Sequence, residues 1–121
     1  MKRLILAAAL LVSIFAFTSC EEDQWGYDNK VIFSARGGEE DVDGDVPIYA
    51  LSIGDYNGKE KQAEGEVILV VNYDWLTAST VKGSDDIQLT VAPNTTGKKR
   101  KLYVYGAVDN RFIDITVVQD K

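Results

Sequence analysis

Alternation of apolar and polar residues is the dominant pattern after the first thirty positions. Residues 87–91 and 112–117 show it most clearly, since every second side chain is aliphatic and those between are mostly polar. This period-two alternation is typical of strands that bury one face. The same reasoning predicts further strands over residues 30–36, 46–53, 66–73, 74–81 and 101–105.

Turn-forming residues separate these predicted strands. Residues 55–58 contain Asn-Gly, which readily adopts the positive φ of a tight turn, and residues 93–97 end another strand with Pro, Asn and Gly. No long segment has the 3.6-residue period and capping residues of a helix. Short strands at about 8–12-residue spacing therefore predict an all-β fold, an antiparallel β-sandwich of about seven strands in one domain.

The inward positions of the strands define a predicted core. Residues 67–71 are five consecutive apolar residues, which is typical of a central strand. Such a run does not by itself show which side chains face inward. Each buried apolar side chain contributes about 1.5–3 kcal/mol, so the domain needs no metal or disulfide to fold. The predicted core is Val31 or Ile32, Phe33, Ile48, Ile68, Val70, Ile87, Leu89, Val91, Leu102, Val104, Ile113, Ile115 and Val117.

The first nineteen residues have the composition of a signal peptide. Lys2 and Arg3 precede an apolar run over residues 4–17 that only Ser13 interrupts. As a helix this run would be about 21 Å long, short of the hydrocarbon core of about 30 Å. We therefore interpret it as a cleaved targeting segment, with a permanent anchor or a buried helix as the alternatives.

The single cysteine follows this run directly. Residues 17–20, Phe-Thr-Ser-Cys, resemble the lipobox of bacterial lipoproteins, although Phe17 stands where Leu is usual. The resemblance implies that Cys20 is acylated and holds the protein on a membrane. The acidic residues 21–23 are similar to the surface-export signal of Bacteroidetes lipoproteins, and a plain solvated linker is the alternative. The predicted organisation is a signal peptide over 1–19, Cys20 and a tether over 20–29, and a sandwich over 30–121.

Composition excludes several kinds of chemistry. The 121 residues contain no histidine and one cysteine, so imidazole-based catalysis, an internal disulfide and a cysteine-rich metal site are excluded. The net charge of -6 argues against nucleic acid as a partner, because phosphate neutralisation needs a basic surface. We expect no catalytic residues, no metal and no cofactor, and a non-enzymatic protein.

A series of short motifs spans roughly residues 30–121. They are the segments 33–38, Asp-Trp-Leu-Thr at 74–77, Leu-Thr-Val-Ala at 89–92, Asn-Thr-Thr-Gly at 94–97, Lys-Lys-Arg at 98–100 and Ile-Thr-Val-Val-Gln at 115–119. The order of these motifs resembles that of the BACON domain, named as Bacteroidetes-associated, carbohydrate-binding and often N-terminal. This resemblance implies an Ig-like sandwich and an association with surface proteins that handle glycans.

Three aromatic residues are the candidates for carbohydrate binding. Tyr103 and Tyr105 have the outward parity of a strand whose Leu102 and Val104 face inward. Two tyrosines on one face, about 7 Å apart, offer flat apolar surfaces with polar tips, which suit a sugar ring. The alternative is that they only cover the sheet. Trp75 matches the tryptophan of the resembled family, and we expect it to pack at the sandwich edge.

Other motifs are weaker candidates. Residues 41–45, Asp-Val-Asp-Gly-Asp, resemble a calcium loop, but the glycine is misplaced and a solvated acidic turn is the better interpretation. The basic run over 98–101 is interpreted as the start of a strand, with an acidic glycan or partner as the alternative. Trp25 and Tyr27 could dock onto the domain or reach a partner.

The sequence thus predicts a non-catalytic lipoprotein of the cell envelope, in the outer membrane and exposed at the surface, whose β-sandwich binds glycans. The membrane is the expected partner through the lipid on Cys20, with glycans or a surface protein complex as further partners. The rival hypothesis is a structural spacer or an assembly module without a sugar site. The rival would be favoured if a double Tyr103→Ala/Tyr105→Ala exchange left glycan binding unchanged.

Overall fold

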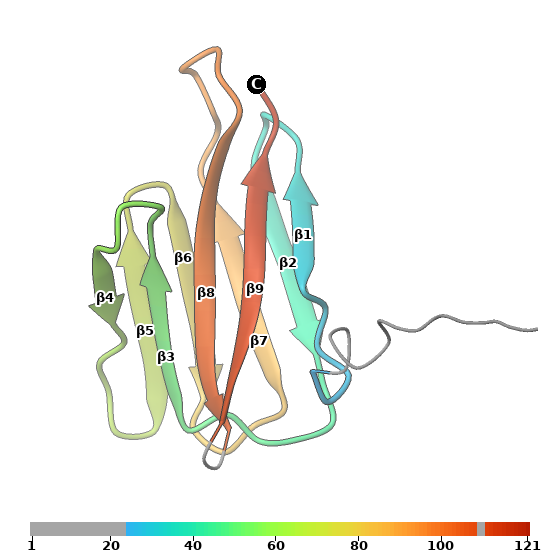
Figure 1. The fold of residues 1–121 in the computed structure, drawn as a ribbon, viewed down its shortest axis with the longest axis vertical. Coiled ribbons are helices and arrows are strands. Elements are labelled where there is room, and N and C mark those ends of the chain that lie inside the picture. The colour runs from blue at the N-terminus through green and yellow to red at the C-terminus, as the bar shows by residue number, and fades with distance from the viewer. Residues whose placement is uncertain (1–23, 109–110) are drawn as a thin grey trace, which may run out of the picture.

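The computed structural model describes residues 24–108 and 111–121, where the chain forms nine strands and no helix (Figure 1). The prediction of an Ig-like β-sandwich is confirmed. This part of the chain has no helix that could span a membrane. The predicted signal segment and Cys20 lie outside the described residues. The strands are β1 (Lys30–Phe33), β2 (Gly38–Asp43), β3 (Ala50–Gly54), β4 (Glu60–Gln62), β5 (Ile68–Tyr73), β6 (Leu76–Val81), β7 (Asp86–Val91), β8 (Arg100–Val108) and β9 (Arg111–Gln119).

The strands form two sheets that pack face to face. One sheet has five strands in the order β1-β9-β8-β3-β4, and the other has four in the order β2-β7-β6-β5. β1 runs parallel to β9, whereas the other strand pairs of the described residues are antiparallel. In Figure 1 the longest strands, β8 and β9, lie in the middle of the five-stranded sheet. This sheet therefore has a broad outer face.

The side chains between the sheets form one core, and most of the predicted core is buried. Ile87 and Leu89 on β7 and Ile113 and Ile115 on β9 are all fully buried, as their alternation predicted. The alternative left open in β1 is resolved, since Val31 packs against the core. Its neighbour Ile32 is exposed.

The predicted inward face of residues 67–71 is wrong. Leu69 and Val71 are buried, whereas 56% of Ile68 and 47% of Val70 are exposed. The physical reason is that a run of consecutive apolar residues carries no alternation that marks one face as inward. The pairing of β5 with β6 sets the inward face instead. Val71 lies opposite Ala78 on β6, and both side chains are buried.

Two strands were not predicted, and one of them replaces an expected turn. Residues 41–43, interpreted as part of an acidic turn, belong to β2, which pairs with β7 over its whole length. Val42 is buried while its acidic neighbours Asp41 and Asp43 are exposed, so this strand buries one side chain at the edge of its sheet. The other addition is the short edge strand β4. The predicted strand over 46–53 begins only at Ala50.

The segment expected to be a tether is docked onto the sandwich. Tyr27 is part of the buried core, and Trp25 packs against it. The Tyr27 hydroxyl donates a hydrogen bond of 2.5 Å to the carbonyl of Val46. The amide of Asp45 donates to the carbonyl of Trp25 over 2.6 Å. The packed unit therefore extends upstream of residue 30, the predicted domain boundary.

Candidate functional site

Tyr103 and Tyr105 lie on the outer face of the five-stranded sheet. Their neighbours Leu102 and Val104 on β8 are buried, and the two tyrosines are half-buried on the opposite face. Their ring centroids are 6.5 Å apart and their planes differ by 25°. The two rings are therefore nearly parallel and form one aromatic surface along the strand.

A glycine makes room for this surface. Gly54 on β3 is paired with Tyr103 across the sheet, and a Cβ placed on it would come within 2.9 Å of the Tyr105 ring. The absence of a side chain at this position allows the Tyr105 ring to lie over the backbone of the neighbouring strand.

Polar groups flank the tyrosines on both sides. Tyr105 lies opposite Asp114 on β9 and opposite Ser52 on β3. The Ser52 hydroxyl donates a 2.7 Å hydrogen bond to the Glu60 carboxylate, and the Gln62 side-chain amide donates to the same oxygen over 3.2 Å. Carboxylates and an amide beside an aromatic surface are the groups that bind sugar hydroxyls while the ring stacks.

Burial changes the titration of this site. Desolvation raises the pKa of the Asp114 carboxyl. Desolvation also raises the pKa of the Tyr105 hydroxyl, and the negative charges of Asp114 and Glu60 raise it further. The Tyr105 hydroxyl therefore stays protonated at neutral pH and remains a hydrogen-bond donor.

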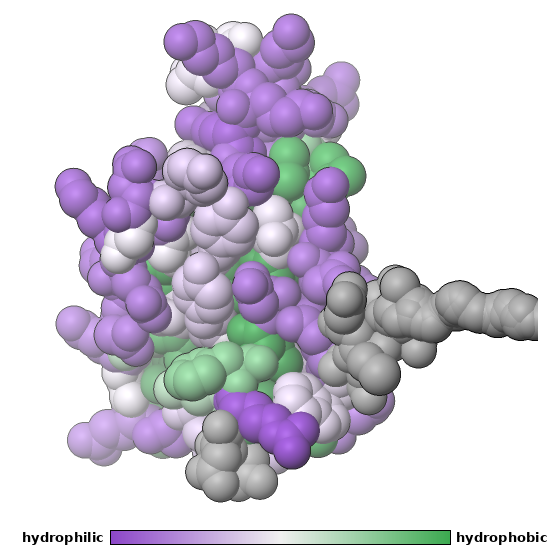
Figure 2. Space-filling view, in the orientation of Figure 1, coloured by the Kyte–Doolittle hydropathy of each residue, from purple (hydrophilic) through white to green (hydrophobic). Residues whose placement is uncertain are grey.

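Phe112 extends the aromatic surface and was not among the predicted candidates. It lies on β9 opposite Ala107, which shares its face of β8 with the tyrosines, and 73% of Phe112 is exposed. Figure 2 shows weakly polar side chains along the middle of this face, hydrophobic ones below them, and strongly polar ones at the sides. The outward parity of residue 112 in the strand pattern was the signal that could have identified it.

Trp75 belongs to the core instead of this surface. It lies in the two-residue turn between β5 and β6, where Asp74 has a φ of 57°. Only 7% of Trp75 is exposed, and the guanidinium of Arg100 lies 4.7 Å from its ring centroid. The ring therefore has no open face for a sugar, and the tyrosines are the sequence candidates that remain accessible.

The acidic and basic runs differ in their relation to the tyrosines, and only Lys101 of the basic run shares their strand face. Within the described residues no group of three or more acidic or cysteine side chains converges as a metal site would require. In the basic run, Arg100 stacks on Trp75, and the Lys99 ammonium lies 4.0 Å from the Asp120 carboxylate. Lys101 is exposed on β8, with the parity of Tyr103.

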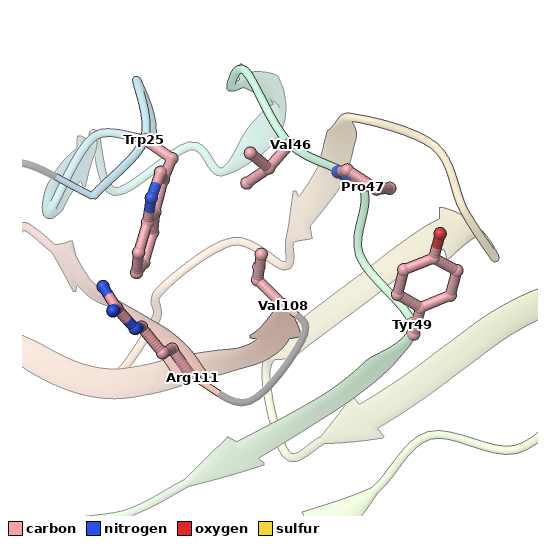
Figure 3. A pocket seen from close by; sticks show the side chains of 6 residues that line it. All are labelled: Trp25, Val46, Pro47, Tyr49, Val108 and Arg111. Atoms are coloured by element: carbon pink, nitrogen blue, oxygen red, sulfur yellow. The ribbon is translucent and has the colours of Figure 1, made fainter.

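A hollow of about 470 Å³ lies at the end of the sandwich where β9 begins (Figure 3). Trp25 and Arg111 lie together on one side of it, and Tyr49 lies on the other. The Arg111 guanidinium carbon is 5.5 Å from the Trp25 ring centroid. Val46, Pro47 and Val108 complete the lining. The hollow was not predicted, because its residues come from three separate segments.

Comparison with known proteins supports the fold and nothing beyond it. No protein-family model matches the chain, and no curated protein matches it. A solved structure described as "NMR structure of the protein from Bacteroides thetaiotaomicron" is similar, with a TM-score of 0.54 and 19% sequence identity. The similarity covers 78% of this chain and 79% of that chain. At this identity the likeness shows that both chains share a β-sandwich architecture.

Proposed function

We propose that this protein is a non-catalytic, lipid-anchored component of the cell envelope whose BACON-like β-sandwich binds glycans. The observation that carries the proposal is the pair of nearly parallel tyrosine rings, 6.5 Å apart, on an open sheet face. Asp114 and Glu60 beside them supply acceptors for sugar hydroxyls, and Gln62 supplies a donor. Aromatic stacking with a few placed polar groups is sufficient for binding without catalysis.

The proposed location rests on the sequence upstream of the described residues. The apolar run over residues 4–17 and Cys20 resemble a lipoprotein signal, and residues 21–23 resemble an export signal. Acylation at Cys20 would place the sandwich on the outer membrane with its aromatic face accessible at the cell surface. More than one acyl chain is needed for stable anchoring.

Glycan binding is tested by a glycan array followed by isothermal titration on the chain from residue 21 onward. We expect binding by the unchanged chain, and about five- to 150-fold weaker binding after Tyr103→Ala/Tyr105→Ala, because each of the two stacking contacts contributes about 0.5–1.5 kcal/mol. A matched control is Ile68→Ala/Val70→Ala, which removes two exposed side chains from the outer face of the other sheet. Equal affinities for all three proteins, or no binding to any glycan, would contradict the proposal.

Anchoring is tested by labelling cells with palmitate. We expect the label on the unchanged protein, which should sediment with membranes, and we expect Cys20→Ser to abolish both, because the thiol is the acylated group. The control is Ser19→Ala, which keeps the thiol and a small residue before it. Labelling that persists in Cys20→Ser would refute the anchor while leaving the glycan proposal standing.

A second candidate function, an assembly module, is favoured by the outer face of the four-stranded sheet. Exposed aliphatic side chains gather there, namely Ile68 and Val70 on β5, Val81 on β6 and Val67 just before β5. Ile68 lies opposite Val81. Adjacent exposed aliphatic side chains are typical of sites of protein contact. A stoichiometric partner that is lost with Ile68→Ala/Val70→Ala, together with unchanged glycan responses, would favour this candidate.

A further inference from the structure

The hollow at the end of the sandwich contains a cation, Arg111, that has no carboxylate partner among residues 24–108 and 111–121. Among the described residues, Lys99 and Asp120 form the one ion pair within 4.0 Å. Arg111 therefore forms no ion pair with any of these residues. The Arg111 guanidinium is held against the Trp25 ring instead, 5.5 Å from its centroid. A cation–π contact restrains a guanidinium and leaves its N–H groups free to donate elsewhere.

The lining of the hollow matches a ring that carries one negative group. Figure 3 shows Tyr49 across the hollow from Arg111, with Val46 and Val108 between them. Tyr49 is 54% exposed and offers an aromatic face, while the valines form an apolar floor. A guanidinium binds a carboxylate through two parallel hydrogen bonds, which gives both affinity and orientation.

The hollow adjoins the aromatic surface described above. Arg111 is followed in β9 by Phe112, whose ring is exposed on the same face as Tyr105 and Tyr103. Ala107 on β8 lies opposite Phe112. The aromatic surface between Tyr103 and this position is therefore about 14 Å long. Arg111 pairs with the buried Val108 and so has the opposite parity to Phe112, and a short glycan that leaves the tyrosines past Phe112 reaches Arg111 by turning over the end of the sheet.

The charges around this end limit the kind of acid that fits. Asp43, Asp45, Asp85 and Asp86 lie close enough to the Tyr27 hydroxyl to raise its pKa. These carboxylates repel a densely charged polymer, whereas a single carboxylate in the hollow gains the direct contact with Arg111. The arrangement favours a largely neutral glycan that carries one acidic sugar.

We infer that this hollow binds the carboxylated ring of a singly acidic oligosaccharide, with Arg111 paired to the carboxylate and Tyr49 stacked on the ring. The inference rests on the proposed glycan binding and names its specificity: the tyrosines bind neutral rings, and Arg111 selects the acidic one. Trp25 acts as a positioning residue that holds the guanidinium.

The test compares glycans that differ in one carboxylate. Aldotetraouronic acid and 3′-sialyllactose, each beside its carboxyl-reduced form, are titrated into the chain from residue 21 onward. We expect an acidic form to bind about tenfold more tightly than its reduced form, as charge-assisted hydrogen bonds imply. Arg111→Gln should remove this preference without weakening the reduced form. Arg36→Gln is the matched control, since Arg36 is exposed in the turn between β1 and β2, at the opposite end of the molecule.

Each outcome separates the inference from the proposal beneath it. Equal binding of acidic and reduced forms, or a preference that survives Arg111→Gln, would overturn the inference and leave glycan binding intact. Absence of binding to every glycan would overturn both. If Arg111→Gln unfolds the chain, salt gives a second measurement on the unchanged protein: the preference should shrink as sodium chloride rises from about 20 to 300 mM, and a constant preference would overturn the inference.

Discussion

Tyr27 shows how one side chain attaches an upstream segment to the sandwich. Its ring is buried directly beside Gly44, where a Cβ would lie only 2.1 Å from the ring. Its hydroxyl donates to the carbonyl of Val46. Burial, and then the negative charges of Asp85 and other nearby carboxylates, raises the pKa of Tyr27 from 10.0 to about 12. Ionisation of this hydroxyl therefore opposes the folded state.

Alkaline unfolding tests this residue. Because the pKa of Tyr27 is higher in the folded state, its contribution to stability is complete below pH 10 and is lost as the pH rises toward about 12. We expect the free energy of unfolding, measured by urea titration, to fall across this window. The fall should be shallower in Tyr27→Phe, which also loses about 1 kcal/mol at neutral pH with its hydrogen bond.

The matched control for this measurement is Tyr56→Phe, since 86% of Tyr56 is exposed in the turn after β3. It should reproduce the alkaline profile of the unchanged protein. An identical profile for Tyr27→Phe would show that the buried hydroxyl does not control alkaline unfolding.

At the scale of elements, Gln119 connects the end of β9 to two loops. It is fully buried, and its side-chain amide donates to the carbonyls of Ser34 over 3.1 Å and Ala92 over 2.9 Å. Its side-chain oxygen accepts a 2.8 Å hydrogen bond from Arg100, which also stacks on Trp75. One buried amide thus satisfies backbone groups after β1 and after β7, which belong to different sheets.

Removal of this amide should be costly. Gln119→Ala removes the hydrogen bonds to the Ser34 and Ala92 carbonyls, leaves the Arg100 Nε–H without its acceptor and opens a cavity at a fully buried position. We therefore expect a loss of about 3 kcal/mol in the free energy of unfolding. Chemical denaturation followed by tryptophan fluorescence measures it, because Trp75 lies in the same cluster. Gln88→Ala, at an exposed position on β7, should change stability by less than about 0.5 kcal/mol. Equal effects of the two exchanges would contradict this role for Gln119.

The success of strand prediction depended on the presence of alternation. Residues 87–91 and 112–117 alternate, so their inward faces were predicted correctly. Residues 67–71 do not alternate, and their inward face was predicted wrongly. Leu69 and Val71 are buried there, whereas Ile68 and Val70 were predicted to be. β2 was not predicted, because one buried valine among acidic residues gives only a weak strand pattern. The strand is instead stabilised by its pairing with β7, which the local sequence does not reveal.

The candidate site was predictable only where it lies within one strand. Tyr103 and Tyr105 are two positions apart in β8, so their shared face follows from parity alone. The room made by Gly54 depends on the pairing of β3 with β8, and the contact of Arg111 with Trp25 joins positions far apart in the chain. The contact of Arg100 with Trp75 likewise joins two separate segments. No local pattern contains such information.

At the scale of the whole molecule, the two outer faces of the sandwich differ in chemistry. The five-stranded sheet presents tyrosines with flanking carboxylates, and Phe112 continues this surface toward Arg111. The four-stranded sheet presents aliphatic side chains such as Ile68 and Val81. We propose that glycans bind to the first face and that the second makes contacts with protein.

The most direct test of this assignment is a nuclear magnetic resonance titration of the isotope-labelled chain from residue 21 onward with a glycan selected on the array. We expect amide shifts to concentrate at Tyr103, Tyr105 and Asp114 and at the adjoining part of β3, residues 52–54. Shifts confined to β5 and β6, or spread evenly over both sheets, would contradict it.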